Sequence, residues 1–152
     1  MIKLHDKYFK PFISSEEIDS AISKLVDQIS TDLGDEIPVF VGILNGSFMF
    51  VSDFVKKYPK PCEVTFIKLA SYEGLKSTED IQRLIGLTQD LTGRTVVILE
   101  DIIDSGKTMF EVHRIFKNEK VKRLVIATLF YKPQAYKEDF KIHHIGMNIP
   151  DK

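Results

Sequence analysis

The stretch TVVILEDIIDSGKT, residues 95–108, joins an apolar run to a group of acidic and small polar residues. Its first five residues are apolar or β-branched without a break, which is typical of a strand buried on both faces of a parallel sheet. The acidic pair Glu100 and Asp101 follows directly, and a helix is predicted to begin at about Lys107. Ligands of parallel α/β sheets bind at the carboxyl ends of strands, so this connection is the candidate functional site.

Outward from this stretch, strand and helix patterns alternate along the chain. A capping box at Ser14 and Glu17 precedes apolar residues at helical spacing and predicts a helix that Gly34 ends. The other predicted elements are a strand at 39–44, a helix that Ser47 is expected to cap and that runs to about Tyr58, a β-rich stretch at 62–72, a returning strand at 81–87, a helix at 107–117, and strands at 123–130 and 141–147. This alternation predicts an α/β fold: a doubly wound, mostly parallel sheet with helices on both faces, and a polar loop at 73–80 that suits a flexible lid.

Composition and charge narrow the class of protein. The 152 residues match a single domain spanning 1–152, with 43% hydrophobic and 28% charged residues, as in globular proteins. The 21 basic and 22 acidic residues give a net charge of −1, without the basic excess of a nucleic-acid binder. No apolar run approaches the ~20 residues of a membrane span, and the single Cys62 allows no internal disulfide. We therefore expect a cytoplasmic protein with neither nucleic acid nor membrane as partner.

The connection after the apolar run has the chemistry of an anion and sugar site. A helix that begins there offers unpaired backbone N–H groups and the positive end of its dipole to an anion. Gly106 gives a flexible backbone that can approach a phosphate closely. Ser105 and Thr108 add hydroxyl donors, and Lys107 adds a positive charge. The acidic Glu100 and Asp101 would repel a phosphate and suit a diol or a magnesium ion beside it. Phosphate plus diol indicates a ribose 5-phosphate.

Two other interpretations of this connection are less consistent with the sequence. Gly106-Lys107-Thr108 resembles the end of a Walker A loop, but that motif requires glycine five residues before Gly106, where this chain has Asp101. The acidic residues could instead be solvated loop charges, which is the usual place of such groups. The grouping of three carboxylates with Gly-Lys-Thr in one strand-to-helix connection favours a binding site.

The residues EDIIDSGKTM, 100–109, resemble the phosphoribosyl-pyrophosphate signature of the hypoxanthine-guanine phosphoribosyltransferase family. Three further segments are similar to motifs of that family: VGILNGS at 41–47 to its pyrophosphate loop, Ser71-Tyr72 to the root of its lid, and Lys132-Pro133 to a base-binding element. The resemblance extends from about Phe40 to Lys152. It implies the type I phosphoribosyltransferase fold and the 6-oxopurine branch of the family.

The resemblance also implies a reaction of purine salvage. A glycosyltransferase of this family moves ribose 5-phosphate from phosphoribosyl pyrophosphate to N9 of hypoxanthine or guanine, giving IMP or GMP and pyrophosphate, with Mg²⁺ as cofactor. By match, the residues that would bind phosphoribosyl pyrophosphate are Asn45, Gly46, Glu100, Asp101, Asp104, Ser105, Gly106, Lys107 and Thr108. Glu100 and Asp101 would hold the ribose hydroxyls directly or through the metal. Family members assemble as dimers or tetramers, so we expect a homodimer or homotetramer.

Other matched residues would act on the purine, the lid and the pyrophosphate. The family's general base falls on Asp104, which would take or share a proton on the purine's imidazole nitrogen as N9 becomes the nucleophile. Lys132 matches the lysine that donates to the exocyclic O6, and because an ammonium can only donate, it would select 6-oxopurines over 6-aminopurines. Ser71 and Tyr72 would anchor a lid that excludes water. Asn45 stands where many family members have lysine, so backbone amides are expected to hold the pyrophosphate there.

The sequence ends at Lys152, before the segment in which the family carries a purine-stacking aromatic residue, a further metal-binding aspartate and an arginine near the pyrophosphate. We therefore expect the family's C-terminal base-binding tail to lie outside this sequence. Because the contacts that discriminate among purines lie largely in that tail, a xanthine-preferring enzyme is an alternative. A non-catalytic, nucleotide-sensing regulator on the same fold is a second alternative, although an RNA-binding version would be expected to have a basic face.

Overall fold

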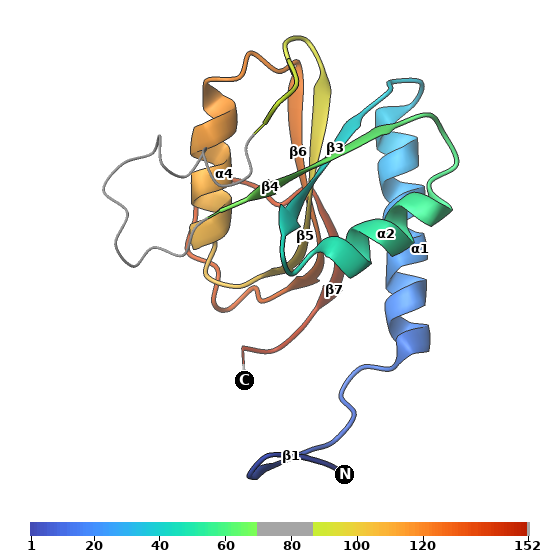
Figure 1. Ribbon diagram of the computed structural model, residues 1–152, viewed down its shortest axis with the longest axis vertical. Helices are drawn as coiled ribbons and strands as arrows, with labels where there is room; N and C mark the ends of the chain where they lie inside the picture. The colour runs from blue at the N-terminus through green and yellow to red at the C-terminus, as the bar shows by residue number, and fades with distance from the viewer. Residues whose placement is uncertain (70–86, 152) are drawn as a thin grey trace.

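Figure 1 shows the computed structural model of the chain, which describes residues 1–69 and 87–151. The elements are strands β1 (Ile2–Leu4) and β2 (Lys7–Phe9), helix α1 (Ser15–Leu33), strand β3 (Val39–Leu44), helix α2 (Phe48–Lys57), strands β4 (Glu63–Lys68) and β5 (Thr95–Ile103), helix α4 (Lys107–Lys117), and strands β6 (Arg123–Tyr131) and β7 (His144–Asn148). The predicted lid at 73–80, its root at Ser71 and Tyr72, and all but the last residue of the predicted strand at 81–87 lie outside the described residues.

Five strands form one parallel sheet in the order β4-β3-β5-β6-β7 (Figure 1). β5 lies in the middle, where Val97 is opposite Phe40 of β3 and Val125 of β6. Every residue of β5 from Thr95 to Glu100 is buried, as predicted for a strand covered on both faces. The chain order reverses beside β5, because β3 and β4 extend the sheet one way and β6 and β7 the other. Such a reversal leaves a crevice outside the carboxyl ends of the strands.

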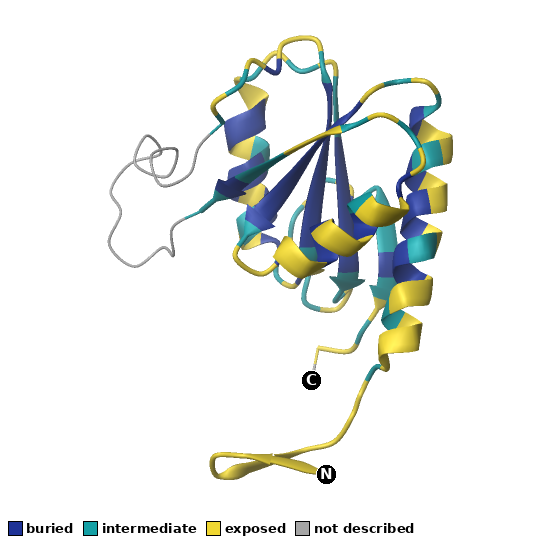
Figure 2. Ribbon diagram, turned by 45° about the vertical axis from the view of Figure 1, so that its right-hand side comes forward, coloured by how far each residue is buried: buried dark blue, intermediate teal, exposed yellow. Residues whose placement is uncertain are grey.

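Helices cover both faces of the sheet (Figure 2), which confirms the doubly wound α/β arrangement. α1 and α2 lie on one face, where Leu25 and Phe54 share a buried apolar cluster with Leu99 of β5. α4 lies on the other face, where Met109 and Val112 belong to a second buried cluster. Among the helices of the described residues, none is long and apolar enough to cross a membrane.

α1 begins at the predicted capping box. The Ser14 backbone N–H donates to Glu17 Oε2 (2.7 Å), and the Glu17 backbone N–H donates to Ser14 Oγ (3.1 Å). These bonds satisfy donors that would otherwise have no partner in the first turn. A buried stripe then holds the helix on the sheet, formed by Ala21, Ile22, Leu25, Val26, Ile29 and Leu33.

Replacing Ser14 with alanine is expected to lower the free energy of unfolding by about 1 kcal/mol, because the Glu17 N–H loses its acceptor. The matched control is Ser20→Ala, at an exposed position in the interior of the same helix. This control is expected to change stability by less than about 0.5 kcal/mol. Urea unfolding followed by circular dichroism measures both differences. Equal values for the two variants would contradict a stabilising capping box.

The structure corrects several details predicted from the sequence: β7 begins at His144 rather than at Lys141, and two further corrections lie near the site. β5 continues to Ile103, past its predicted end, so Glu100 and Asp101 belong to the strand rather than to the loop after it. The reason is that β6 extends alongside and pairs with this part of β5. Ser47 is the second correction: it does not cap α2 with its side chain, because its hydroxyl donates to the Ile43 carbonyl oxygen (2.7 Å) in a buried position.

The N-terminal residues form a hairpin that the sequence did not predict. β1 and β2 pair antiparallel, with Ile2 opposite Phe9 and Leu4 opposite Lys7. Every residue of both strands is exposed, and the hairpin extends away from the sheet and the helices (Figure 2). Two strands of three residues carry too short an alternating pattern to be recognised among the charged residues at this end of the chain.

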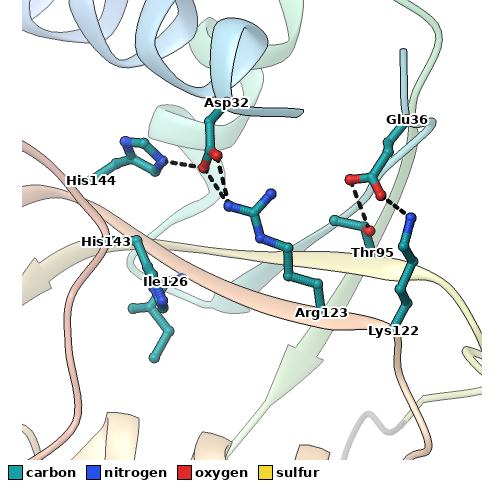
Figure 3. A network of polar contacts seen from close by, with 8 residues as sticks. All are labelled: Asp32, Glu36, Thr95, Lys122, Arg123, Ile126, His143 and His144. Carbon is teal, nitrogen blue, oxygen red and sulfur yellow. Dashed lines mark hydrogen bonds and ion pairs between the residues drawn. The ribbon is translucent and has the colours of Figure 1, made fainter. Parts of the chain in front are cut away.

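A polar network joins α1 to β6 and β7 at the amino ends of these strands, away from the predicted site (Figure 3). Arg123 Nη2 donates to Asp32 Oδ1 and Oδ2 (2.7 and 2.8 Å), and His144 Nε2 lies 2.9 Å from Asp32 Oδ2. Hydrogen bonds from Arg123, and then from His144, lower the pKa of Asp32 below its usual value. Glu36 and Lys122 form a second ion pair beside it. The network fixes the end of α1 to the sheet.

Asp32→Asn is expected to destabilise the protein by about 1–2 kcal/mol at pH 7, because the bond from Arg123 loses its charge. A carboxyl group with a lowered pKa stabilises the fold above its ordinary pKa of 3.8 and loses this contribution as the pH falls through its folded-state value. The difference in unfolding free energy between wild type and variant should therefore shrink below about pH 4. Asp27→Asn, at an exposed position of the same helix, is the control and should change stability by less than about 0.5 kcal/mol. A difference that grew toward acid pH would refute this role of Asp32.

Candidate active site

The carboxyl ends of β3, β5 and β6 meet at one edge of the sheet. β3 leads into residues 45–47, β5 leads into α4 through residues 104–106, and β6 ends directly before Lys132. β5 lies between the other two strands. The three connections that the sequence predicts to bind ligand therefore lie next to one another.

A hollow of about 90 Å³ lies at the start of α4. Its lining is formed by Glu100, Ile102, Ile103, Asp104, Ser105, Gly106, Lys107, Thr108 and Met109. This is several times the volume that one ordered water molecule needs, which leaves room for a compact anion. The first N–H groups of a helix have no acceptor within the helix and carry the positive end of its dipole. Together with two hydroxyls and a lysine, they make the hollow chemically suited to a phosphate group.

Gly106 caps α4 with a φ of +92°, in the left-handed region that glycine adopts without steric cost. A β-carbon at this position would lie 2.7 Å from Tyr136 Cε2 and 2.6 Å from Glu138 Cγ. From the sequence, this glycine is expected to let the backbone approach a phosphate. The structure supplies a packing reason, because the side that lacks a β-carbon faces the segment that follows β6.

Glu100 and Asp101 form the acidic part of the site. Glu100 is 6% exposed, and its Oε1 accepts a hydrogen bond from the Asp101 backbone N–H (3.2 Å). Burial raises the pKa of Glu100 to about 9, and the neighbouring Asp101 adds to this shift. Glu100 is therefore neutral at pH 7 when no cation is near. A divalent cation beside Glu100 would favour its ionised form.

The acidic pair fits a magnesium ion that is shared with a phosphate-bearing ligand. Mg²⁺ is usually held by one or two carboxylates together with substrate phosphates and water. Within residues 1–69 and 87–151, no cluster of three or more histidine, cysteine, aspartate or glutamate side chains could hold a metal. Glu100 and Asp101 are the two carboxylates that could contribute to such a site.

The connection after β3 lies against this acidic pair. A β-carbon on Gly46 would lie 2.7 Å from Asp101 Oδ2, so a larger residue would displace the carboxylate. Asn45 and Gly46 are exposed, and the Leu44–Asn45 peptide bond is cis. The loop predicted to bind pyrophosphate and the pair predicted to bind ribose are therefore neighbours.

Asp104 and Lys132 follow different strands and form an ion pair, with Lys132 Nζ 3.4 Å from Asp104 Oδ2. Lys132 Nζ also donates to the backbone carbonyl oxygen of Asp151 (3.3 Å) and lies 3.7 Å from Asp151 Oδ1. The Lys132 side chain is 19% exposed and the Asp104 side chain 55%, so the carboxylate is open to an incoming ligand. The predicted general base and the predicted purine-binding lysine are thus in contact.

Some predicted site residues cannot be placed, and some residues of the site were not predicted. Ser71 and Tyr72 lie outside the described residues. Two residues of the site are not predicted from the sequence: Asp151, which contacts Lys132, and Tyr136, which packs at Gly106. Each of these two is far along the chain from its contact and belongs to no motif that would indicate it.

A parallel sheet with a small hollow at a helix start and an acidic pair beside it is the arrangement expected of an α/β protein that binds a phosphorylated sugar. Residues 14–150 match the family model of the phosphoribosyl transferase domain. The chain is 40% identical over 144 residues to hypoxanthine phosphoribosyltransferase of Salmonella typhimurium, covering 92% of this chain and 80% of that protein. It is 32% identical over 143 residues to hypoxanthine-guanine phosphoribosyltransferase of Bacillus subtilis, covering 93% and 79%.

Solved structures show the same similarity. A hypoxanthine-guanine phosphoribosyltransferase from Bacillus anthracis matches with a TM-score of 0.85 and 32% identity, over 95% of this chain and 83% of that one. A hypoxanthine phosphoribosyltransferase from Staphylococcus aureus matches with a TM-score of 0.84 and 32% identity, over 94% and 78%. The chain belongs to the hypoxanthine-guanine phosphoribosyltransferase family. This confirms the predicted type I fold and the prediction that the chain is a glycosyltransferase.

Proposed function

We propose that this chain transfers ribose 5-phosphate from phosphoribosyl pyrophosphate to N9 of hypoxanthine or guanine, forming IMP or GMP and releasing pyrophosphate. The observation that carries the proposal is the contact between Asp104 and Lys132 beside the phosphate-sized hollow. It puts a proton acceptor and a donor for a carbonyl oxygen within reach of one purine. The names of the relatives, hypoxanthine and hypoxanthine-guanine phosphoribosyltransferases, support the same substrates.

In this proposal the hollow at the start of α4 holds the 5-phosphate. The phosphate oxygens would accept hydrogen bonds from the helix amides and from the hydroxyls of Ser105 and Thr108. The positive charge of Lys107 would attract the same oxygens. Glu100 and Asp101 hold the ribose hydroxyls, directly or through a metal. This division follows from charge, because carboxylates repel a phosphate and accept hydrogen bonds from a diol.

We assign the pyrophosphate to the loop after β3 and the magnesium ion to the acidic pair. Asn45 and Gly46 offer backbone amides to the pyrophosphate, and Gly46 lies against Asp101. Glu100 and Asp101 are the residues that would hold Mg²⁺. When bound, the ion neutralises charge on the leaving pyrophosphate and orients it.

The transfer breaks the bond between C1 of the ribose and a pyrophosphate oxygen and forms a bond between C1 and N9 of the purine. Positive charge develops on the sugar as pyrophosphate leaves with the bonding electrons. Asp104 takes or shares a proton on the imidazole ring, so that N9 supplies the electron pair. Lys132 Nζ donates to O6, and because an ammonium cannot accept a bond from an amino group, it favours 6-oxopurines.

We further propose that residues 1–152 act as one catalytic domain in a homodimer or homotetramer in the cytoplasm. The family resemblance supports the assembly, and the free thiol of Cys62 is suited to a reducing compartment. Light scattering measures the mass in solution. Two or four times the chain mass of 17.4 kDa would support the proposal, and a monomer would contradict it.

The reaction is tested by mixing the protein with Mg²⁺, phosphoribosyl pyrophosphate and each of hypoxanthine, guanine, xanthine and adenine, and measuring pyrophosphate release. We expect release with hypoxanthine or guanine, none with adenine, and loss of release when EDTA replaces Mg²⁺. A preference for xanthine would support the xanthine enzyme instead. Binding of IMP without release from any base would indicate a nucleotide-sensing protein and contradict the proposed reaction.

A further inference from the structure

The segment after β6 folds back over the connection that leads into α4. Two backbone hydrogen bonds join them: the Lys132 N–H donates to the Ile103 carbonyl oxygen (3.0 Å), and the Lys137 N–H donates to the Ser105 carbonyl oxygen (3.1 Å). These bonds lie on both sides of Asp104. The chain that carries Lys132 therefore also braces the backbone of the phosphate hollow.

Tyr136 lies in this segment with its ring held on several sides. The ring packs edge-on against Tyr131 (5.5 Å between centroids) and Phe140 (6.1 Å), and its hydroxyl donates to the Phe140 carbonyl oxygen (2.6 Å). Burial, and then the neighbouring Tyr131, raises the pKa of Tyr136 to about 12, so the hydroxyl stays a donor at neutral pH. These contacts hold the Tyr136 ring in one position.

The Tyr136 ring packs against the turn that starts α4. The missing β-carbon of Gly106 would be 2.7 Å from Tyr136 Cε2, which puts the ring edge against the left-handed turn. Gly106 and its neighbours line the hollow, and Tyr136 is not one of the lining residues. A change in the ring therefore changes how firmly the amides of the hollow are held, without touching the ligand itself.

We infer that Tyr136 is a positioning residue for the 5-phosphate: its ring supports the Gly106 turn and keeps the backbone amides at the start of α4 directed at the phosphate. The inference rests on the proposed function, because it assigns the 5-phosphate to this hollow. Preorganised donors bind more tightly since the ligand does not have to order them. Removal of the ring leaves the turn free to move, and phosphate binding must then supply the ordering entropy.

The test compares the affinities of IMP and inosine, which differ only in the 5-phosphate, for wild type and Tyr136→Ala. We expect the Kd of IMP to rise about tenfold in Tyr136→Ala, while the Kd of inosine stays within about twofold. Tyr136→Phe keeps the ring and is expected to keep the Kd of IMP within about threefold of wild type. Tyr8→Ala makes the same substitution in the exposed N-terminal hairpin and should change neither Kd.

Isothermal titration calorimetry on the full chain measures these constants. Tyr136→Leu, titrated in parallel, keeps apolar volume in case the alanine variant does not fold, and it should weaken IMP binding in the same selective way. Equal weakening for IMP and inosine, or an unchanged preference for IMP, would overturn the inference while leaving the proposed function in place. A wild-type protein that binds inosine as tightly as IMP would overturn both, because no 5-phosphate site would then exist.

Discussion

Replacing Asp104 with asparagine is expected to lower kcat by about 10²- to 10⁴-fold, the usual contribution of a general base. The amide has nearly the shape of the carboxylate, but it cannot take a proton from the purine ring. The affinity for phosphoribosyl pyrophosphate should stay within about threefold, because the helix amides and hydroxyls that hold the 5-phosphate are unchanged. Steady-state kinetics with hypoxanthine and titration with phosphoribosyl pyrophosphate separate the two effects.

The structure offers a matched control for this substitution. Lys132 has two acidic neighbours, since its Nζ lies 3.4 Å from Asp104 Oδ2 and 3.7 Å from Asp151 Oδ1. Asp151→Asn removes a carboxylate from the same lysine without removing the proposed base, so it tests whether charge near Lys132 accounts for the loss. A large loss of kcat in both variants, or an equal loss of turnover and of phosphoribosyl pyrophosphate binding in Asp104→Asn, would rule out Asp104 as the base.

The buried strands and helices could be predicted because their signals are local. Val39–Leu44 and the start of β5 are unbroken apolar runs, and a run of this kind is compatible with few positions other than the centre of a parallel sheet. α1 was predicted from its first turn, because Ser14 and Glu17 bond to each other within four residues of chain. Neither prediction depends on what packs against the element.

The end of β5 could not be predicted, because it depends on a partner strand. A charge after an apolar run is typical of a strand end, but Glu100 is buried beside β6, and burial raises the pKa of its carboxyl group. The hydroxyl of Ser47 illustrates the same limit, since its choice between the helix start and the Ile43 carbonyl oxygen depends on the turn geometry. A local sequence pattern indicates that a polar group needs a hydrogen-bond partner, but it does not indicate which partner that is.

The part of the candidate site that lies within one connection could be predicted from the sequence. The contacts between segments that are distant along the chain could not. Residues 104–108 contain the hydroxyls, the glycine and the lysine in sequence, and they line one hollow. Gly46 lies close to Asp101, and Tyr136 packs on Gly106, because separate connections meet there. A glycine in the sequence shows that space or an unusual φ is needed, but only the fold shows that Glu138 and Tyr136 occupy the space at Gly106.

Lys132→Met is expected to lower kcat/KM for hypoxanthine by about 10- to 100-fold, which is the value of one hydrogen bond from a charged donor. Methionine keeps the unbranched apolar stem but cannot donate to O6. The KM for phosphoribosyl pyrophosphate should change little, and the kcat/KM for unsubstituted purine, which lacks O6, should be nearly unaffected. The selectivity for hypoxanthine over purine, measured as the ratio of the two kcat/KM values, should therefore fall by the same factor.

The control is Lys137→Met, which removes the charge of an exposed lysine in the same segment whose backbone N–H still donates to the Ser105 carbonyl oxygen. It should leave the selectivity unchanged. The ion pair with Asp104 offers a second explanation for any loss in Lys132→Met, because the lysine also influences the proposed base. That influence would lower the rates with hypoxanthine and purine alike, whereas a bond to O6 affects only hypoxanthine. An equal loss for the two bases would therefore assign Lys132 to the base and not to the recognition of 6-oxopurines.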